Sequence, residues 1–499
     1  MFKSEIRQST INDLLTKAAS KSYSKYLPKM VIKKVRGFID QPVSFDFPVT
    51  AIIGPNGGGK TTIMGAAGCA YKNVVPRRFF AKSGIYDESM QDWAIEYDIV
   101  DKALNAKDTI RRTASFKNFR WNRDALDREV LVFGVTRTVP ANERSDMIPM
   151  TRRRFTVPES NIAVLSNVVS TAVSRILGKD VTEFTTMRQK AAGQVVLLGG
   201  KSAGFRYSEF HFGAGEASII RMVLEIEAAP DNCLILIEEI ENGLHPVATI
   251  RLVEYLIEVA ERKRVQVIFT THSNEALAPL PSKAVWVATR DRVMQGKLDI
   301  ASLRALTGEI KKSAAIFVED AFARIWVEAM LRAGAAELVD HVEVHAMSGD
   351  GIAVAVNKHH NRDPSVSAPS ICIIDGDSEQ QTSDEDWVFR LPGTMPEEYV
   401  FDRVLEKWDE LGGRLSVALW REFDKHEAVK EICLEARRHN MDMHLIFDQV
   451  GEKVGLVPGQ TVAGAFCTLW AQTYRDEAAV LLQKANDAIA FFAEKRHTK

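Results

Sequence analysis

The sequence predicts an α/β protein of more than one domain, followed by a helical C-terminal region. A Gly-rich loop near residue 54 stands between an apolar run and a helix-compatible segment, and strand-like runs alternate with amphipathic stretches from about residue 233 and again from about residue 314. Beyond about residue 396 the pattern is helical and charged. A chain of 499 residues is too long for one hydrophobic core, so we expect two or three domains.

The composition is close to neutral, with 64 Lys and Arg residues against 66 Asp and Glu residues. This balance excludes a globally basic nucleic-acid coat protein but leaves room for local basic patches. Five cysteines lie far apart without a C-x-x-C pair, as is typical of reduced thiols in a cytoplasmic protein: Cys69, Cys233, Cys372, Cys433 and Cys467. Residues 1–29 lack an apolar signal region and no run of about 18 apolar residues occurs, so we expect neither secretion nor a membrane span.

The stretch Gly54-Pro55-Asn56-Gly57-Gly58-Gly59-Lys60-Thr61 matches the phosphate-loop pattern G-x-x-x-x-G-K-[ST]. It follows the apolar run of residues 49–53 and precedes a helix-compatible segment that starts at Thr62. Backbone N–H groups of such a loop converge on phosphate oxygens, Lys60 neutralises the terminal phosphates and the Thr61 hydroxyl ligates Mg²⁺. The pattern predicts a nucleoside triphosphate site that is lined by Asn56, Gly57, Gly58, Gly59, Lys60, Thr61 and Thr62.

A strand over residues 234–237 ends in two carboxylates, Glu238 and Glu239. This arrangement predicts that Glu238 lies near Mg²⁺ and that Glu239 polarises the attacking water. Asp is the usual first acid, and the longer side chain of Glu238 reaches the metal through water, so slow hydrolysis is expected. The alternative is a strand end with two acids of purely structural role.

Three further motifs accompany this strand in a fixed order. Phe212-Gly213-Ala214-Gly215-Glu216 opens a helix upstream, Glu241-Asn242-Gly243-Leu244-His245-Pro246 follows the acids, and Thr270-Thr271-His272-Ser273 closes the next strand. Together with the phosphate loop, they resemble the ABC-type ATPase superfamily, specifically its SMC-like and OLD-family heads, over about residues 30–290. The resemblance implies ATP and Mg²⁺ as ligands and His272 as the switch that senses the γ-phosphate.

The same resemblance implies that Gly213, Gly215 and Glu216 contact ATP bound to the opposite subunit. Gly213 replaces the serine of the commoner signature. One surface offers the phosphate loop, while the free N–H groups of the signature helix, which favour an anion, come from another molecule. We therefore expect ATP to join two heads in a homodimer or a larger even assembly.

A second constellation of acids lies further along the chain. Glu319 follows the strand-like residues 316–318, and Asp375 and Asp377 follow the run 371–374. Acids at the C-terminal ends of parallel strands converge on one crevice, where they repel one another unless a divalent cation neutralises them. The pattern predicts an Mg²⁺ or Mn²⁺ site suited to phosphodiester hydrolysis. Ordinary turn residues are the alternative for the D-G-D segment.

The spacing of Glu319 and the D-x-D pair resembles the Toprim domain, in which Glu319, Asp375 and Asp377 would be the catalytic metal ligands. An ABC-type head followed by Toprim is the layout of the OLD-family nucleases, which are associated with anti-phage defence and DNA processing. The resemblance spans about residues 30–400. It implies nucleic acid as a partner, with DNA favoured over RNA.

The chain departs from this family at Ala323, where a second acid often stands, and at Asp320, where Gly is common. Four further acids are possible crevice residues: Asp350, Glu379, Glu397 and Glu398. For Glu397 and Glu398 the favoured interpretation is the first turn of a helix after Pro396, where acids complement the helix dipole.

Three basic segments interleave cations with aromatic rings, residues 77–80, 116–123 and 152–155. Nucleic acid would use the cations for phosphates and the rings for stacking. A strand with one solvated face produces the same pattern and is the favoured interpretation. His359 and His360 are expected in an exposed loop.

We therefore expect an N-terminal extension at 1–29, an ABC-type ATPase domain at 30–305, a Toprim-like domain at 306–400 and a helical region at 401–499. The predicted function is an ATP-gated, metal-dependent nuclease of OLD type. The main alternative is an ATPase scaffold or sensor that holds a separate effector protein through a non-catalytic Toprim-like domain. A chromosome-maintenance ATPase is disfavoured because no long heptad run is present.

Overall fold

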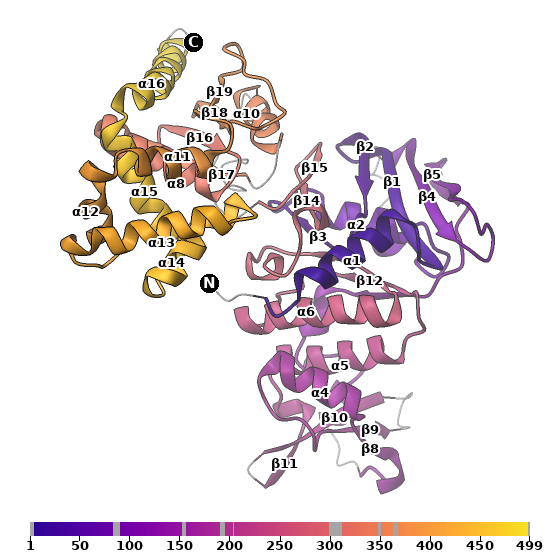
Figure 1. The fold of residues 1–499 in the computed structure, drawn as a ribbon. Helices are drawn as coiled ribbons and strands as arrows, with labels where there is room; N and C mark the ends of the chain where they lie inside the picture. The colour runs from indigo at the N-terminus through magenta and orange to yellow at the C-terminus, as the bar shows by residue number, and fades with distance from the viewer. Residues whose placement is uncertain are drawn as a thin grey trace. The chain divides into compact units, whose positions relative to one another are not determined.

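A computed structural model (Figure 1) describes residues 4–82, 90–151, 156–189, 195–202, 204–298, 312–347, 351–362 and 368–497. The basic segment at 152–155 and Asp350 lie outside these residues. The chain forms two compact units, residues 1–297 and 298–499, which are described separately. The sequence-based division at residue 400 falls inside the second unit, whereas the division at residue 305 falls among residues that are not described.

The centre of the first unit is a largely parallel sheet whose strands are buried on both faces. Its order is β15 (Val293–Gln295), β14 (Val285–Ala288), β3 (Val49–Ile53), β13 (Gln266–Thr270), β12 (Leu234–Ile237) and β7 (Val130–Phe133). Only β15 runs antiparallel to its neighbour among these pairings. Continuous apolar runs such as Leu234–Ile237 suit this position because both faces of the strand are covered.

An antiparallel sheet lies over the phosphate-loop helix α2 (Lys60–Gly68). Its order is β2 (Phe38–Ser44), β1 (Lys25–Val35), β4 (Trp93–Asp101), β5 (Ile110–Lys117) and β6 (Arg120–Arg123). Side chains of α2 belong to one apolar core with residues of both sheets. The rings of Phe116 and Trp121 pack at 5.4 Å within this layer, so they serve the core rather than the surface.

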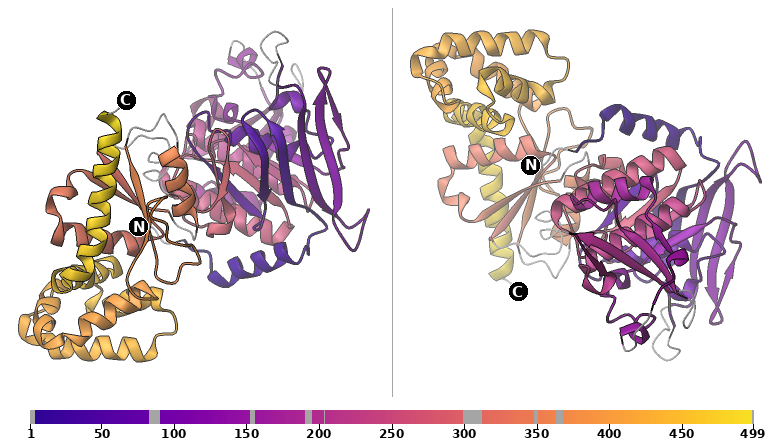
Figure 2. Two further views of the ribbon diagram at one scale, coloured as in Figure 1. Left: turned by 90° about the horizontal axis from the view of Figure 1, so that it is seen from above. Right: turned by 90° about the horizontal axis from the view of Figure 1, so that it is seen from below.

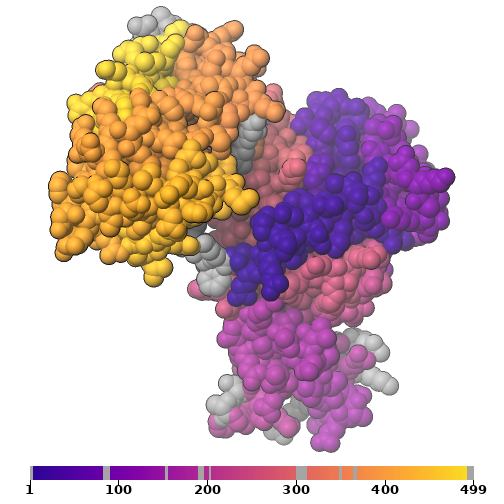
Figure 3. All heavy atoms as spheres, viewed as in Figure 1, coloured from indigo at the N-terminus to yellow at the C-terminus, as the bar shows by residue number. Residues whose placement is uncertain are grey.

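The remaining part of the first unit combines a small sheet with helices. The elements are α1 (Gln8–Ala19), α3 (Ile148–Thr151), β8 (Ile162–Val164), α4 (Asn167–Leu177), β9 (Thr185–Gln189), β10 (Val195–Ser202), β11 (Phe205–Ser208), α5 (Ala214–Ala228) and α6 (Pro246–Lys263). In this small sheet, β8 pairs with β9 in an antiparallel manner. Helix α1 lies on the surface beside α6 (Figure 3).

The second unit contains a four-stranded parallel sheet in the order β17 (Val342–Ala346), β16 (Ala314–Val318), β18 (Ser370–Ile374) and β19 (Val388–Arg390). Helix α8 (Ala321–Gly334) connects β16 to β17, and α10 (Ile352–Arg362) connects β17 to β18. Because β17 and β18 flank β16, right-handed crossovers place the two helices on opposite faces (Figure 2).

Helices after the sheet share its core rather than forming a core of their own. They are α11 (Pro396–Glu406), α12 (Trp408–Ala418), α13 (His426–His439), α14 (Ile446–Gly455), α15 (Gly459–Thr473) and α16 (Arg475–His497). The short helix α9 (Ala336–Val339) lies earlier in the chain, between α8 and β17. One apolar cluster runs from β16 to α16, and within it the rings of Trp326 and Trp470 lie 4.9 Å apart. The sheet and these helices therefore depend on each other for burial.

The prediction of an exposed loop at His359 and His360 is wrong. Both residues lie in α10, and His360 is 1% exposed. The face of α10 that meets the sheet carries polar Asn357, whose Nδ2 donates to the Asp386 carbonyl at 2.7 Å. A buried face with Asn and His hides the apolar periodicity by which a helix is recognised.

Short 3₁₀ helices complete the described elements: η1 (Pro76–Arg78), η3 (Val135–Thr138), η4 (Glu159–Asn161), η5 (Glu209–His211), η6 (Glu275–Leu277), η7 (Ser282–Ala284), η8 (Phe423–Lys425) and η9 (Met443–Leu445). Among the described residues no single helix has the length and apolar character to cross a membrane, although the bent pair Met443–Gly455 and Gly459–Thr473 meets the requirement by length and composition alone.

Candidate nucleotide site and acidic crevice

The phosphate loop joins the buried strand β3 to helix α2. Gly54 and Gly59 adopt φ values of 148° and 98°, which side chains other than glycine rarely tolerate. A Cβ on Gly59 would also lie 2.4 Å from the ring of Phe38, and a Cβ on Gly54 would lie 2.1 Å from the carbonyl oxygen of Ala288. The loop conformation therefore requires glycine at both positions.

Lys60 is buried at the start of α2. Its Nζ donates to the carbonyl oxygens of Gly54 at 2.9 Å and Pro55 at 3.0 Å. Burial lowers the pKa of Lys60, and the carboxylates of Glu239 and Glu241 oppose that effect. A buried ammonium at a helix N-terminus is well suited to phosphate oxygens, because each phosphate charge removes part of the cost of burial.

A cavity of about 380 Å³ opens above the loop. The predicted residues that line it are Asn56, Gly57, Gly59, Lys60, Thr61, Thr62, Glu238, Glu239 and His272. Gly58 is absent from the lining, and its N–H donates to the Pro55 carbonyl at 3.0 Å. The structure thus brings the loop, the two acids and the predicted switch residue His272 to one cavity, whose volume lies within the usual range of ligand sites.

The cavity wall also contains two arginines that the sequence motifs did not predict, Arg36 and Arg290. The Nη1 of Arg36 donates to the Thr62 hydroxyl at 2.6 Å, so that hydroxyl already has a protein partner. The turns that carry the arginines meet closely, since a Cβ on Gly37 would lie 2.3 Å from the Arg290 carbonyl oxygen. No motif marks such residues, because their approach depends on two turns that are far apart in the chain.

The backbone that carries the paired acids is held from two sides. The Glu239 N–H donates to the Thr270 hydroxyl at 2.9 Å, and the Arg137 guanidinium donates to the Glu238 and Glu239 carbonyl oxygens at 2.6 Å each. Glu239 adopts φ 45°, a conformation that a non-glycine residue enters only when its surroundings enforce it. Its carboxylate therefore reaches the cavity from a fixed position.

His272 lies on a loop held by Glu241. The His272 N–H donates to Glu241 Oε1, and the Thr271 hydroxyl donates to Glu241 Oε2, both at 2.6 Å. Burial and the charge of Lys60 lower the pKa of His272, with Glu241 and Glu239 acting in the opposite direction. These effects favour the neutral imidazole, which can exchange a hydrogen bond with a phosphate oxygen without adding charge.

The predicted signature residues do not line this cavity. Gly213 caps α5, and a Cβ on Gly215 would lie 2.0 Å from the Gly243 carbonyl oxygen. Glu216 accepts from Lys179 Nζ at 2.8 Å. The N-terminus of α5 thus packs against the segment that follows the paired acids, and the contact of its residues with ATP in a second subunit stays a prediction.

The acids of the second unit meet at one edge of its sheet. β16 and β18 are parallel neighbours with Val318 opposite Ile373, so Glu319 and Asp375 leave adjacent strands at the same end. Glu319 is 8% exposed, whereas Asp377 is exposed. Arg390 Nη1 holds the D-x-D segment by donating to the carbonyl oxygens of Asp375, Gly376 and Ser378 at 2.8–3.0 Å.

Repulsion among these acids is strong at Asp375. Burial, followed by the charges of Asp320, Glu319, Glu397 and Asp377, raises the pKa of its carboxyl from 3.8 to about 9. Its Oδ1 is buried without a hydrogen-bond partner among the described residues. A carboxyl in this position takes up either a proton or a cation.

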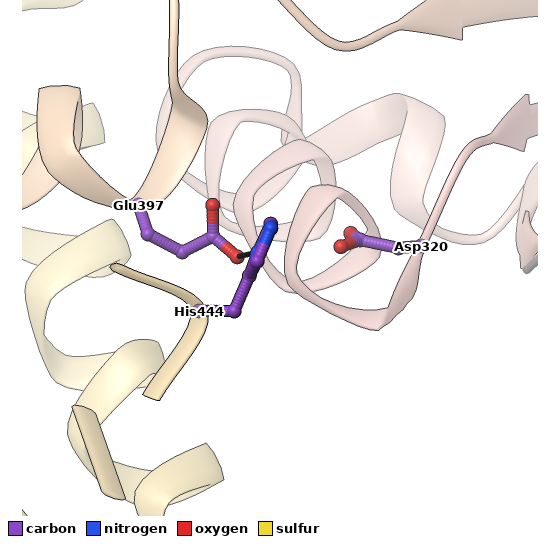
Figure 4. Close-up of side chains that lie close together, drawn as sticks. All are labelled: Asp320, Glu397 and His444. Atoms are coloured by element: carbon purple, nitrogen blue, oxygen red, sulfur yellow. Dashed lines mark hydrogen bonds and ion pairs between the residues drawn. The ribbon is translucent and has the colours of Figure 1, made fainter. Parts of the chain in front are cut away.

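Three side chains next to this crevice form a group that the sequence did not reveal. Ligand atoms of Asp320, Glu397 and His444 lie within 4.8 Å of one another, and Figure 4 shows the three side chains pointing toward each other. Glu397 lies in the first turn of α11 as predicted, but it is 4% exposed and faces the crevice acids. Glu398 instead pairs with Arg437.

Replacing Asp375 with Asn is expected to stabilise the metal-free protein at neutral pH. Between about pH 4 and pH 9 the unfolded chain has released the Asp375 proton while the folded chain retains it, so folding stability falls as pH rises. Because Asn carries no titrating proton, it removes this loss. We expect the free energy of unfolding at pH 8 to rise by ~1 kcal/mol or more, and Tm to rise by about 2–4 °C for each kcal/mol.

Thermal unfolding in EDTA at pH 5, 6.5 and 8 measures this effect. The gain should grow with pH and be absent from Asp384→Asn, whose carboxylate is 83% exposed in the same unit. A gain that shrinks from pH 5 to pH 8 would contradict the electrostatic account.

Two family models match the N-terminal half of the chain. One is described as "AAA domain, putative AbiEii toxin, Type IV TA system" and matches residues 102–278; the other is described as "AAA domain" and matches residues 29–77. No curated protein matches the chain significantly in sequence.

Solved structures of SMC heads are similar to part of the chain. An Smc head bound to the C-winged helix domain of ScpA has 14% identity and a TM-score of 0.39, covering 56% of this chain and 99% of its own. An Smc head with an extended coiled coil bound to the C-terminal domain of ScpA, from Pyrococcus furiosus, has 11% identity and a TM-score of 0.37, covering 58% and 100%. The SMC head from Thermotoga maritima has 13% identity and a TM-score of 0.33, covering 54% and 98%.

The family matches enclose Glu238, Glu239, His272 and the loop at Gly54–Thr61. Residues 29–77 and 102–278 are therefore similar to AAA domains.

Proposed function

We propose that this protein is an ATP-gated, divalent-metal-dependent nuclease of OLD type that cleaves DNA in anti-phage defence. The observation that carries the proposal is the meeting of Glu319 and Asp375 at the ends of neighbouring parallel strands, with the pKa of Asp375 raised to about 9 by burial and by the surrounding acids. Such a crevice gains most by exchanging a proton for Mg²⁺ or Mn²⁺. Glu319, Asp375 and Asp377 would hold the metal.

The chemistry of this crevice suits a phosphodiester. A bound divalent cation supplies an activated water and a counter-charge for the leaving oxygen. Arg390 fixes the D-x-D backbone through three carbonyl oxygens, so the carboxylates of Asp375 and Asp377 project from a rigid turn. Rigid carboxylates would keep the metal at a fixed position relative to the scissile phosphate.

Asp320 offsets the absence of an acid at position 323. The Ala323 side chain is buried in the core, where an acid would be costly. Asp320 instead caps α8 through the Ala323 N–H at 2.7 Å and acts electrostatically on Asp375. The number of carboxylates at the crevice is thereby maintained.

The ATPase unit supplies the gate in this proposal. Lys60 and Thr61 would bind the phosphates and Mg²⁺ of ATP, Glu238 would hold the metal through water, and Glu239 and His272 would act on the γ-phosphate. Gly213, Gly215 and Glu216 would meet ATP bound to a second copy. The first-turn N–H groups of α5 favour such an anion, and no neighbour lies within 4 Å of a Cβ built on Gly213. ATP would therefore close a homodimer or larger even assembly.

The assignment to defence rests on two resemblances. The order of motifs is similar to that of OLD-family proteins, and one matching family model carries the description of an AbiEii toxin. DNA is the favoured substrate and RNA the alternative, because a metal crevice alone distinguishes phosphodiesters poorly.

A matrix of cleavage reactions tests the proposal. Purified full-length protein is incubated with plasmid DNA or total RNA, with Mg²⁺, Mn²⁺ or EDTA, and with or without ATP. We expect DNA cleavage that requires the metal and responds to ATP. Cleavage of RNA alone would reassign the substrate, and intact substrates under every condition would refute the nuclease.

An ATPase scaffold that holds a separate effector protein is the second candidate. The observation in its favour is Glu238, since a glutamate in place of aspartate favours long-lived ATP complexes over rapid turnover. Metal analysis of the purified protein separates the candidates. Divalent ions bound through Glu319, Asp375 and Asp377 favour the nuclease, whereas absence of binding at millimolar Mg²⁺ and Mn²⁺ favours the scaffold.

A further inference from the structure

We propose that Asp320, Glu397 and His444 form a second cation site, one that uses an imidazole ligand and selects Mn²⁺ or a later transition metal over Mg²⁺. This inference adds a site to the proposed nuclease, and its test is a binding measurement. The site would make the helical region after residue 400 a contributor of metal ligands.

The three donors come from three separate elements. Asp320 precedes α8, Glu397 lies in the first turn of α11, and His444 lies in η9. Their ligand atoms lie within 4.8 Å of one another (Figure 4). Donors bound to one metal at about 2.0–2.2 Å stand roughly 3–4 Å apart, so side-chain rotation alone would complete the site.

Burial distinguishes this group from a surface ion pair. The side chain of Glu397 is 5% exposed, yet its partner His444, with Nδ1 at 2.8 Å from Glu397 Oε1, is 61% exposed. A buried carboxylate needs a compensating charge, which the imidazole at 2.8 Å supplies when no metal is bound. A divalent cation would compensate both Glu397 and Asp320.

The surroundings favour a cation as well. Asp320 and Glu397 both contribute to the repulsion felt by Asp375, so the group borders the acidic crevice. Asp320 Oδ1 accepts from the Ala323 N–H, which leaves Oδ2 as the oxygen for a metal. Three protein donors with an exposed side would leave coordination positions for water or a phosphate oxygen, as in catalytic sites.

The donor set determines the metal preference. Mg²⁺ prefers oxygen ligands and retains its waters. Mn²⁺ accepts an imidazole ligand more readily than Mg²⁺ does, and Co²⁺, Ni²⁺ and Zn²⁺ bind imidazole well. A crevice with carboxylates at Glu319, Asp375 and Asp377 and an imidazole at its border would therefore hold two cations of different preference.

Pulsed electron paramagnetic resonance of the full chain loaded with Mn²⁺, without nucleotide, tests the site. The ¹⁴N nucleus of an imidazole bound to Mn²⁺ modulates the decay of the electron spin echo, which is called ¹⁴N modulation below. We expect this modulation in the wild type and in His439→Gln, an exposed histidine nearby in the sequence, and its loss in His444→Gln. Mn²⁺ affinity of this site should fall about tenfold or more in His444→Gln.

Further variants separate this site from the other metal positions. The ¹⁴N modulation should persist in His272→Gln and in Asp377→Asn, whereas Asp320→Asn, which retains a helix-capping side chain, should weaken it. Absence of Mn²⁺ binding, absence of modulation in the wild type, or modulation that survives in His444→Gln would each overturn the inference.

The outcomes also distinguish this inference from the nuclease. Modulation without cleavage of any substrate would retain the site and reject the nuclease. Cleavage without modulation would retain the nuclease and reject the site.

Discussion

Glu239→Gln is expected to lower ATP hydrolysis by about 100-fold or more while ATP still binds, because loss of a positioned base costs roughly 10²–10⁴ in rate. Glu239 lines the cavity, and its backbone is held by the Thr270 hydroxyl and by Arg137, so the amide should occupy the same place. Phosphate release measures the rate, and equilibrium binding of a fluorescent ATP analogue measures the retained affinity.

Arrested hydrolysis should also reveal the assembly. Sedimentation of Glu239→Gln with ATP is expected to show at least a doubling of mass relative to the same protein without ATP. Glu261→Gln, on the exposed side of α6, serves as the matched control and should keep wild-type hydrolysis. A monomeric mass with and without ATP would remove the dimer from the proposal.

Asp375→Ala combined with Asp377→Ala is expected to abolish cleavage, with a loss of about 1,000-fold or more, since metal-ion catalysis contributes several kcal/mol and each 1.36 kcal/mol is tenfold. ATP hydrolysis should remain within about twofold, because both residues lie in the unit of residues 298–499 and the nucleotide cavity lies in the other unit. Plasmid nicking and phosphate release on the same preparations measure the two activities.

Asp384→Ala provides the matched control for the double variant. Its carboxylate is 83% exposed and pairs with Lys484, away from the acids that act on Asp375. Cleavage that persists in the double variant, in a preparation free of contaminating nuclease, would count against the crevice as the catalytic site.

Buried parallel strands were the most predictable elements. The runs at 234–237 and 370–374 coincide with β12 and β18, because strands covered on both faces leave an uninterrupted apolar signal. Helices α14 and α15 lie in the region that was predicted to be helical, but their separate bounds were not predicted. Apolar residues such as Val450 and Phe466 are buried in the common core, and the two helices are separated by only Leu456, Val457 and Pro458.

The meeting of side chains at the cavity above the phosphate loop was predictable where the residues belong to motifs. Lys60, Glu239 and His272 meet at one cavity because each follows a strand of the same parallel sheet. Arg36 and His444 carried no such signal. His444 meets Glu397 across 47 residues, and the contact depends on how α11 and the segment before α14 pack in the shared core.

The single apolar cluster from β16 to α16 limits how the chain can be dissected. A truncation near residue 400 would strip Trp326 of the Trp470 ring and leave the back of the sheet open to water. Such a fragment would aggregate before its chemistry could be assayed. For the same reason, a change that loosens the C-terminal helices would also disturb the sheet edge that carries Glu319 and Asp375.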